Sequence, residues 1–587
     1  MKNVLITAAI VCLEAMIVIA CITACSSDDV IDNIYDPFSV STQGGVTAGS
    51  GELSTFTVEI DSTTAEPVDD VAAEYMPEAE DSIEQNSFAN VLNITFNNGS
   101  APSVDDVDGV TVSIDGEHVT IDHGATKGLR YVVSGTTQAG SLTIAGTKKY
   151  ALEMNGVSIS NPDSAAINLL SKKRAYIILA DGSKNTIADA TTSKADHKAT
   201  FYAKGKLLLS GSGTLNINAN YNNGLQTADY IVFRTGNKVN IKAVSGHGIK
   251  TNDGVFVNGG IINVETAGAA AKGINSESHI IVNGGRTTVI TTGTGAWDTD
   301  DNEAKGAAAI KTDSTLTVNG GQLLLRSTGA GGKGIKADGD ATINAGTVKV
   351  ITTGSVYSSG GDTASPKGIK VVGNLNIAGG TVLVRTSGTK AEGIESKAVL
   401  TISGGDVEVA AYDDAINSAG DMYITGGSVV AVGTNNDGLD SNGNMYIKGG
   451  TAVALGSGGA ETGIDIDEQH RLYISGGNIF GIGGRIDAQL GSTTQGIVTT
   501  TGSVTAGSTV YVASGTTVLA RFTMPPYGYS NGTIMLSASG MTSGSSYTVS
   551  LGSTVQTVTA SATLSSTQSG GGMPGGGMPG GGGGRPF

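Results

Sequence analysis

The chain has 587 residues, of which 88 are glycine and 11 are proline, and its formal net charge is −18 at pH 7. This negative charge argues against a nucleic acid as partner. Aromatic residues make up only 5% of the chain, which is too few for a propeller or for a lectin that depends on many stacking aromatics.

The N-terminus carries a candidate export signal. An apolar run at 4–20 is followed by the segment 22–29, which reads ITACSSDD and resembles a bacterial lipoprotein signal, with Cys25 as the lipidated residue. A second candidate lipidation site ends at Cys21, and a membrane-spanning anchor is the remaining alternative, although the run is short for one. The acidic residues after Cys25 resemble the export tag of Bacteroidota surface lipoproteins.

We therefore expect a signal peptide at 1–24 and a lipid anchor in the bacterial outer membrane, with the protein facing the exterior. The lipid anchor is the only contact with the membrane that we expect. All three cysteines, Cys12, Cys21 and Cys25, lie in this leader. The mature chain then has no disulfide and no cysteine-based metal or catalytic site. Residues 25–90 are acidic and poor in apolar side chains, which predicts a flexible tether.

The central part of the chain is a repeat with a fixed internal step. An aliphatic residue recurs every 22 to 36 residues between Leu225 and Ile464, and a glycine turn follows most of these anchors after ten residues. For example, Ile369 leads to Gly379 and Gly380. A period of this size is typical of a solenoid, in which each repeat stacks on its neighbours.

The residues between the anchors indicate strands. Short runs such as 255–257 and 382–384 alternate with period two, and no stretch of the mature chain keeps a helical period over three turns. Residues 91–501 are therefore predicted to form an all-β fold, a right-handed, single-stranded parallel β-helix. We count about twelve rungs from Ile167 to Ile464 at the usual strand spacing. The anchors, among them Ile335, Ile369 and Ile394, should form a buried interior column.

Both ends of such a solenoid need a cover, because an open rung exposes unpaired strand edges. We expect a β cap before the first rungs. The repeat stops near residue 502, and residues 502–560 are predicted to form a strand-rich C-terminal cap. Residues 561–587 are rich in glycine and should be a flexible tail.

Equal positions of successive rungs should stack into two columns on one face. Counted from anchor i, position i+1 reads Gln226, Lys250, Asn275, Lys311, Lys336, Lys370, Glu395, Asn417, Asp440, Asp465. Position i−2 reads Asn223, His247, Lys272, Ala308, Lys333, Lys367, Glu392, Asp414, Asp437, Thr462. The columns are basic in the middle of the solenoid and acidic towards its C-terminal end. Like charges about 5 Å apart are unfavourable unless a counter-ion lies between them.

The acidic end is a candidate calcium site. Calcium takes six to eight hard oxygen ligands, and a few adjacent rungs bring many of them together. The alternative is a solvated acidic turn surface. The candidate ligands are Asp413, Asp414, Asp437, Asp440, Asp465 and Asp467.

The basic middle is a candidate binding site for the carboxylates of an acidic polysaccharide. Trp297 is the only tryptophan and lies in the longest insertion, 293–306, where its indole could stack on a sugar ring. The alternatives are lysines that face solvent and pair with Asp313 or Asp338, and an indole that merely packs within its loop. The candidate glycan-binding residues are Lys250, Lys311, Lys333, Lys336, Lys367, Lys370 and Trp297.

Two further features are expected to be structural. Four asparagines precede the glycine turns of successive rungs and should form a hydrogen-bonded ladder: Asn258, Asn283, Asn319 and Asn344. His247 and His470 are isolated, and neither has a histidine partner at metal-ligand spacing.

Several short sequence motifs resemble those of a known family, and the resemblance covers about residues 92 to 555. They include LEMNGVSI at 152–159, LLSGSGTL at 208–215, YDDAIN at 412–417 and NNDGLD at 435–440. In their order and spacing the chain resembles the calcium-dependent carbohydrate-binding domain family, which is related to family 9 of the polysaccharide lyases. The resemblance implies a right-handed parallel β-helix that binds calcium through the aspartates of motifs such as YDDAIN. Only one rung here keeps the double aspartate, at Asp413 and Asp414.

Three function classes follow from these observations. The favoured one is a non-catalytic lipoprotein of the cell surface, a monomer that binds an acidic polysaccharide with the help of calcium. The second is a polysaccharide lyase, in which calcium neutralises a uronate and a Lys or Arg removes the C5 proton. The nearest candidate bases, Lys390, Lys397, Lys448 and Arg471, occupy no column position beside Asp414 or Asp437, which ranks the lyase second. The third class is a surface spacer or adhesin.

Overall fold

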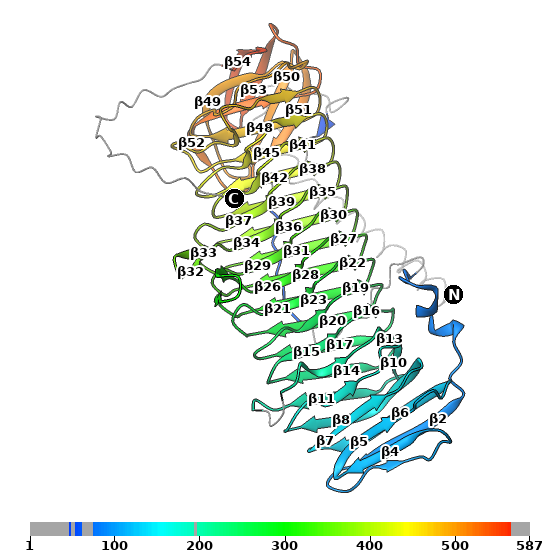
Figure 1. The fold of residues 1–587 in the computed structure, drawn as a ribbon. Helices are drawn as coiled ribbons and strands as arrows, with labels where there is room; N and C mark the ends of the chain where they lie inside the picture. Colours follow the sequence, from blue (N-terminus) through cyan, green and yellow to red (C-terminus); the bar gives the residue numbers. More distant parts are fainter. Residues whose placement is uncertain (1–45, 48–52, 61–73, 193–195, 565–587) are drawn as a thin grey trace, which may run out of the picture.

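The computed structural model describes residues 46–47, 53–60, 74–192 and 196–564. Their strands wind into one long parallel β-solenoid with a cap at each end (Figure 1). The only helices in these residues are two 3₁₀ turns, η1 (Ala79–Asp81) and η2 (Ile83–Gln85), and neither has the length and apolarity needed to cross a membrane. The prediction of an all-β parallel solenoid is confirmed.

One wall of the solenoid carries both predicted columns. It is a 15-stranded sheet that starts with the antiparallel pair β4 (Thr111–Asp115) and β5 (Glu117–Asp122) and is parallel from there on. Twelve strands run from Ile167 to Ile464, so the predicted number of rungs is confirmed. After β5 the strands are β7 (Gly140–Ala145), β9 (Ile167–Leu169), β12 (Ala199–Ala203), β15 (Asn223–Thr227), β18 (Ile249–Thr251), β21 (Lys272–Ser276), β26 (Ala308–Thr312), β29 (Lys333–Ala337), β34 (Lys367–Val371), β37 (Glu392–Ser396), β40 (Ile416–Ser418), β43 (Leu439–Ser441) and β46 (Ile464–Ile466).

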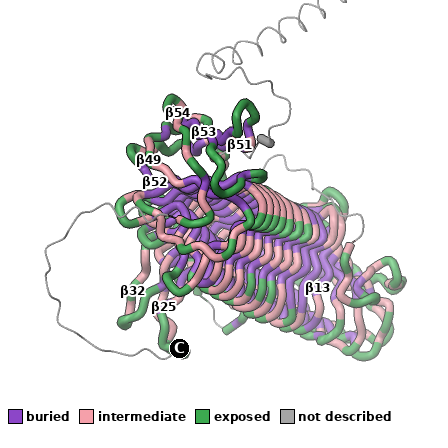
Figure 2. The backbone as a smooth tube through the Cα atoms, turned by 90° about the horizontal axis from the view of Figure 1, so that it is seen from above, coloured by how far each residue is buried: buried purple, intermediate pink, exposed green. Residues whose placement is uncertain are grey.

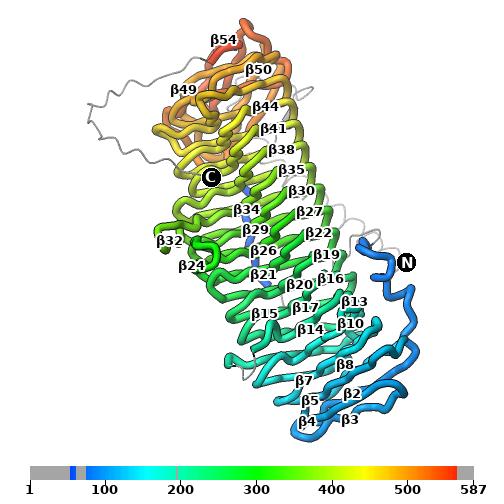
Figure 3. Tube along the Cα trace, in the orientation of Figure 1, coloured from blue at the N-terminus to red at the C-terminus, as the bar shows by residue number. Residues whose placement is uncertain are grey.

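Two further parallel ladders form the other walls, and the long strand β8 (Tyr150–Asn161) pairs with the first strand of each. The second wall consists of β10 (Ala175–Leu179), β13 (Leu207–Gly211), β16 (Tyr230–Phe233), β19 (Gly254–Val257), β22 (Ile280–Val282), β27 (Leu316–Val318), β30 (Ala341–Ile343), β35 (Leu375–Ile377), β38 (Leu400–Ile402), β41 (Met422–Ile424), β44 (Met445–Ile447) and β47 (Leu472–Ile474). The third consists of β11 (Lys184–Asp189), β14 (Thr214–Ala219), β17 (Lys238–Ala243), β20 (Ile261–Thr266), β23 (Arg286–Thr291), β28 (Gln322–Ser327), β31 (Thr347–Thr352), β36 (Thr381–Thr386), β39 (Asp406–Ala411), β42 (Ser428–Gly433), β45 (Thr451–Leu455) and β48 (Asn478–Gly483). The tube in Figure 3 shows the rungs stacked along the solenoid axis.

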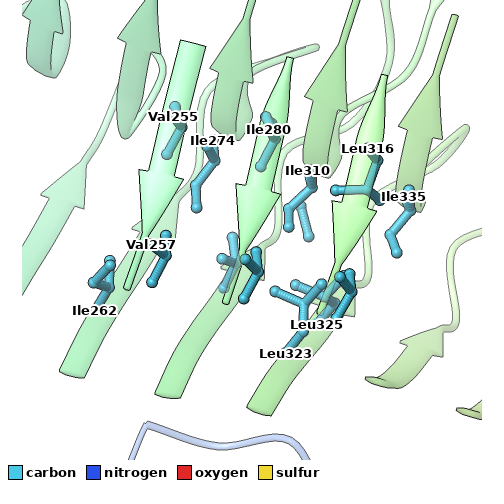
Figure 4. Packing of buried hydrophobic residues seen from close by; sticks show 14 of the residues in the cluster. Val255, Val257, Ile262, Ile274, Ile280, Ile310, Leu316, Leu323, Leu325 and Ile335 are labelled. Carbon is cyan, nitrogen blue, oxygen red and sulfur yellow. The ribbon is translucent and has the colours of Figure 1, made fainter. Parts of the chain in front are cut away.

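The core lies between the three walls, and its residues stack from rung to rung (Figure 4). The anchors Ile335, Ile369 and Ile394 are at most 1% exposed, which confirms the predicted interior column. Each rung adds inward residues from the other walls as well, because alternate strand side chains point to one face. Seen from above, the degree of burial repeats from rung to rung, so that buried, intermediate and exposed positions form bands along the solenoid (Figure 2).

Glycine turns and asparagines fix the corners. Gly285 has φ +73°, and a Cβ there would lie 2.6 Å from the carbonyl carbon of Gly259 on the previous rung, so only glycine fits. The asparagine ladder is confirmed: Asn283 donates to Asn258 at 3.0 Å, and the amides of the next two rungs continue the chain of bonds, from Asn319 to Asn283 and from Asn344 to Asn319.

Both ends of the solenoid are covered. At the start, β2 (Asn90–Asn97) pairs with β3 (Ser103–Val104) and with β6 (Leu129–Thr137), which in turn pairs with β8. At the end, β48 pairs antiparallel with β52 (Tyr529–Ser537), which also pairs with β49 (Val498–Val504). A further sheet contains β1 (Val46–Thr47), β51 (Thr517–Thr523), β50 (Thr509–Ser514), β53 (Ser546–Leu551) and β54 (Thr554–Thr559).

Residues 74–90, predicted to be part of a flexible tether, instead pack on the second wall. Asp81 is fully buried, and its carboxylate accepts hydrogen bonds from Arg174 Nε at 2.7 Å and from the Tyr230 hydroxyl. Glu74 accepts from Arg234 Nε at 2.7 Å. The acidic residues that suggested disorder are therefore ion-pair partners of basic residues far away in the sequence, and the tether prediction is wrong for this stretch.

Residues 53–60 contact the third wall. The backbone and hydroxyl of Ser54 donate to Glu408 at 2.7 and 2.9 Å, Phe56 lies beneath Arg385, and Val58 is 1% exposed. We name residues 53–60 and 74–85 the N-terminal strap, because they connect β1, which pairs with the C-terminal cap, to the first rungs. The predicted signal peptide with Cys25 and most of the glycine-rich tail lie outside the described residues.

Candidate functional site

The two predicted columns exist in register along the 15-stranded wall. Lys311, Lys336 and Lys370 are direct partners on β26, β29 and β34, and the column continues to Glu395 and then to Asp440 and Asp465. In the second column Lys333 stacks on Lys367 and Lys367 on Glu392. The change from basic to acidic character therefore occurs within one continuous face.

A cavity of about 1080 Å³ lies over the basic part of this face. Six of the seven predicted glycan-binding residues line it; the seventh, Lys250, lies outside and pairs with Glu277 at 3.4 Å. The six that line the cavity are Lys311, Lys333, Lys336, Lys367, Lys370 and Trp297.

Two β-hairpins form the outer wall of the cavity. They are the insertions of two rungs, β24 (Ala296–Asp298) with β25 (Glu303–Lys305), and β32 (Tyr357–Ser359) with β33 (Asp362–Ala364), and they project from the side of the solenoid (Figure 2). The Asp362 carboxylate accepts a hydrogen bond from the Ala304 amide at 2.9 Å. This bond joins the two hairpins into one unit, which we call the hairpin wall.

Trp297 is half-buried in the hairpin wall and not freely exposed. Its ring lies against Gly360 so closely that a Cβ at that glycine would be 2.4 Å from the indole. Tyr357 packs in the same way against Gly295. The hairpins thus hold the indole in place while it still borders the cavity.

Most cavity lysines have carboxylate partners. Lys311 pairs with Asp313, and Lys336 pairs with Asp338 at 3.3 Å, which are the partners considered from the sequence. Lys370 lies 3.4 Å from Glu395, which also pairs with Lys397 at 2.5 Å. The cavity is therefore less positive than the lysine columns alone suggest.

The boundary between the basic and acidic parts is a buried network around Lys367. This lysine pairs with Glu392 and lies 3.5 Å from Glu395. Burial raises the pKa of Glu392 to about 7. Burial acts in the same direction on Glu395, but Lys367, Lys370 and Lys397 outweigh it and lower the pKa of this carboxyl.

Lys272 and Lys333 differ from the other cavity lysines. Burial, followed by the charges of neighbouring lysines, lowers the pKa of each to about 7. His247 lies next to them in the same column, and its ring nitrogen accepts a hydrogen bond from the Lys272 amide at 2.9 Å. Burial and the nearby lysines lower the pKa of His247 to about 3, so this histidine is neutral at physiological pH and is a packing residue.

The acidic end brings four of the six predicted calcium ligands together. Asp414 and Asp437 are 6% exposed, and the Asp437 amide donates to Asp414 at 3.1 Å. The Asn417 amide bridges to Asp440 at 2.7 Å. Burial, together with the neighbouring carboxylates, raises the pKa of Asp437 and of Asp440 to about 8 and that of Asp465 to about 6.

The other two predicted ligands are placed differently. Asp467 lies in an exposed turn, where it accepts a hydrogen bond from the Gln469 amide and lies near His470. Asp413 precedes Asp414 at the rim and raises the pKa of that carboxyl by its charge, after burial as the larger cause. Among the described residues, no group of three or more carboxylate, imidazole or thiolate side chains converges on one metal position.

Three features of the site could not be identified from the sequence. Lys272 occupies a column position but was not singled out, because its lack of a carboxylate partner depends on how the rungs stack. Glu392 and Glu395 were placed in the columns, yet their pairing with the lysines was not foreseen. The insertion at 293–306 is visible in the sequence, but not that it joins a second insertion two rungs further on to form the hairpin wall.

Comparisons with known proteins find similarity over part of the chain. A carbohydrate-binding domain-containing protein of Acetivibrio thermocellus is 34% identical over 158 residues, which cover 26% of this chain and 52% of that relative. The chain thus matches about half the length of that relative. A solved structure, described as the polysaccharide lyase-like protein from C. thermocellum in a gadolinium derivative, covers 54% of this chain and all of its own at 20% identity and a TM-score of 0.28.

A family model described as carbohydrate-binding domain-containing protein matches residues 115–272 and 269–415. Together the two matches span just over half of the chain, and the protein therefore belongs to the family of carbohydrate-binding domain-containing proteins.

Proposed function

We propose that the protein binds a polysaccharide with acidic sugar residues in the cavity beneath the hairpin wall and does not cleave it. The observation that carries this proposal is the position of the only tryptophan beside a cavity lined by lysines, on a repetitive face. An indole offers an apolar surface for a sugar ring, and the amines offer donors for its carboxylate. Membership in the carbohydrate-binding domain family supports a polysaccharide as the ligand class.

The length of the site suits a polymer. Its lining includes residues of five successive strands, β21, β26, β29, β34 and β37, which together span roughly 20 Å at the strand spacing. Several sugar units of one chain could therefore make equivalent contacts, and many weak contacts add up along a linear ligand.

The test is pull-down of a polyuronate and of a neutral glycan at low and high salt. Lys311→Met with Lys336→Met should weaken polyuronate binding at least about tenfold, because two donors to carboxylates are lost. Trp297→Ala should weaken it by about two- to tenfold. Lys250→Met is the matched control, since it removes a paired lysine outside the cavity. Binding that is unchanged by salt and by the cavity variants would exclude the cavity as the site, and no binding to any glycan would favour a structural spacer.

A second candidate function, a polysaccharide lyase, is favoured by one observation. Lys272 and Lys333 border the cavity with pKa values near 7, and a general base needs a pKa near the working pH. Incubation with polyuronates should release no unsaturated oligosaccharides if the protein only binds. Time-dependent absorbance of such products, lost in Lys333→Met, would place the protein among the lyases.

We also propose that calcium binds at the acidic end. Its chemistry fits the residues present, since Asp414, Asp437, Asp440 and Asp465 offer hard oxygens, and their pKa values are raised by burial and by one another. These four carboxylates do not converge on one position in the structure, so calcium would have to draw at least three of them together. A bound calcium would neutralise their charge and could attract a sugar carboxylate to the same face.

Calcium should raise the melting temperature by several degrees, because a ligand that binds only the native state stabilises it. Asp414→Ala with Asp437→Ala should abolish that shift, whereas the exposed Asp467→Ala should keep it. No shift of the unmodified protein at millimolar calcium would count against the site.

We propose finally that the protein is a lipoprotein at the outer surface of a bacterial outer membrane, anchored through Cys25, which lies outside the described residues. Metabolic labelling with a fatty-acid analogue in a bacterial host tests this directly. Cys25→Ser should lose the label and Cys21→Ser should retain it; the reverse result would move the lipidation site to Cys21.

A further inference from the structure

Lys272 and Lys333 lack the acidic partners of their neighbours. The ammonium of Lys272 donates to the carbonyl oxygens of Ala270 and Gly306, the latter at 2.7 Å, and that of Lys333 donates to Gly331 at 3.1 Å. No carboxylate of the described residues lies within 4.0 Å of either amine, whereas Lys305, Lys311, Lys336, Lys367, Lys370 and Lys397 all have one.

The two lysines occupy the same column with one small residue between them. Lys272 pairs in register with Ala308, and Ala308 pairs with Lys333, so the two backbone positions are roughly 10 Å apart. Both lysines border the cavity, so a ligand in it can reach the two amines.

Position i−2 lies at the start of β21 and of β29, where the alternation of faces is interrupted. A Cβ at Gly273 or Gly334, the glycines between i−2 and the anchor, would meet the core side chains of Val289 and Val350, so the glycine faces the core as the anchor does. Lys333 is only 9% exposed. The two side chains therefore lie on the cavity face together with the i+1 lysines, and their amines donate to backbone carbonyls there.

The other lysines around the cavity form ion pairs with its carboxylates, without involving Lys272 or Lys333. Lys305 is held by the hairpin acids, with Asp298 at 2.8 Å, while Asp313 and Asp338 hold the lysines of the first column. Glu392 and Glu395 hold Lys367, Lys370 and Lys397, and His247 is neutral at physiological pH. The two cavity lysines without a carboxylate partner among the described residues thus lie on either side of Ala308 in one column.

We propose that Lys272 and Lys333 form an anion subsite of the cavity, which captures a carboxylate or a sulfate ester of the glycan and takes up protons from the solvent as it does so. This inference rests on the proposed function and deepens it, because it names the group that is recognised and couples its capture to pH. The remaining lysines contribute less to selectivity, since a ligand must first displace their carboxylate partners.

The direction of the coupling follows from the free state. With a pKa near 7, each amine is mostly neutral at pH 8 in the free protein. An anion beside it favours the charged form and raises its pKa. Binding above pH 7 therefore takes up about one to two protons, and affinity rises as the pH falls towards 7. Well below pH 7 both amines are already charged, and the proton uptake through them disappears.

Other ionisable groups have pKa values in the same pH range, so the experiment needs a variant that separates their proton uptake from that of the two lysines. Glu392, Asp437 and Asp440 have pKa values near 7 to 8, but they belong to the boundary network and the acidic end. Replacing both lysines by methionine keeps their apolar stems and removes only the two amines. Proton uptake that remains in this variant therefore reports the acidic groups.

The experiment is calorimetric titration at pH 8 and at pH 6, each in two buffers of different ionisation enthalpy. The probes are a polyuronate, a sulfated glycan and a polyuronate whose carboxyls have been reduced to alcohols. The unmodified protein should take up protons at pH 8 with the anionic probes only, and less at pH 6. The affinities for polyuronate and for sulfated glycan show which anion the subsite prefers.

Lys272→Met with Lys333→Met should lose this proton uptake and bind at least about tenfold more weakly, while Lys250→Met keeps both. Equal proton uptake in the double variant and the unmodified protein, with glycan binding intact, would overturn the subsite and leave the proposed function standing. No binding of any probe would overturn both. Release of unsaturated products would mean that the amine takes its proton from the sugar, which also contradicts the proposal.

Discussion

At the scale of single residues, the neighbouring rungs decide how a charged side chain behaves. Lysines at i+1, such as Lys336, reach an acidic partner in the neighbouring turn. Of the three lysines at i−2, Lys367 pairs with Glu392, whereas Lys272 and Lys333 donate only to carbonyl oxygens. The same residue type thus has an ionic partner on one rung and only neutral partners on another.

Because Lys272 and Lys333 are buried amines, the free energy of unfolding should depend on pH. The pKa of Lys272 and Lys333 is lowered to about 7 in the folded protein and is about 10.4 in an unfolded chain. Between these values the unfolded state binds more protons, so the contribution of these groups to stability is least favourable below pH 7 and improves as the pH rises.

Lys272→Met with Lys333→Met should therefore stabilise the protein at pH 6 and help it less at pH 9. Denaturant unfolding at both pH values measures the difference, with Lys250→Met as the control for loss of a paired lysine. A gain that is larger at pH 9 than at pH 6 would contradict the lowered pKa values.

The interior column gives a second prediction at this scale. Ile369→Asp places a carboxylate among the stacked anchors and should cost more than about 4 kcal/mol, enough to prevent folding of the surrounding rungs. Ile369→Val should cost only about 1 kcal/mol. Thermal unfolding and far-UV circular dichroism distinguish the two, and a folded Asp variant of near-normal stability would contradict the packing of Ile369.

At the scale of elements, the hairpin wall depends on a glycine. Gly360 has φ +58°, and a Cβ there would meet the Trp297 ring at 2.4 Å; Gly361 has φ +87°, but a Cβ there would meet nothing within 4 Å. Gly360→Val and Gly361→Val thus share backbone strain and differ in the clash with the indole.

Gly360→Val should displace Trp297, shift its fluorescence to longer wavelength and weaken glycan binding, whereas Gly361→Val should do so less. Because the chain has a single tryptophan, its emission reports on the hairpin wall alone. Identical emission of the two variants would show that the indole does not pack on Gly360.

The N-terminal strap is held mainly by its buried charge. Asp81→Ala leaves Arg174 without its buried partner and Tyr230 without an acceptor, so we expect a loss of about 3 kcal/mol. Glu84→Gln, which removes an exposed partner of Arg234, should cost less than about 1 kcal/mol. Hydrogen exchange should show opening of residues 74–85 in Asp81→Ala only, and unchanged protection there would contradict this role of Asp81.

At the scale of the whole molecule, the repeat determines most of what the sequence could predict. The ten-residue step placed the anchors, the turns and both columns, because stacked rungs repeat one geometry. The strap could not be predicted in this way: Glu74 meets Arg234, 160 residues away, and no local pattern records such a pair. For the same reason the sequence indicated Asp313 and Asp338 as partners of cavity lysines, but not that Lys272 and Lys333 have no acidic partner among the described residues.

The charge pattern of the molecule also has meaning only at this scale. One wall carries a cavity with buried amines and, a few rungs further, a cluster of buried carboxylates, separated by the network around Lys367. Opposite charges on one long face suit an extended ligand that contacts several rungs at once. The hairpin wall covers only the basic part, and it is there that we place the glycan.

The most direct test of this account is a fluorescence titration of Trp297 with polyuronate oligosaccharides. We predict a saturable change in tryptophan emission that gives the same affinity as the pull-down. This affinity should fall with added salt and should be at least about tenfold weaker in Lys272→Met with Lys333→Met. Polyuronate binding in pull-down without any change in tryptophan emission, and with full affinity in Trp297→Ala, would contradict the account, because the glycan would then bind outside the cavity.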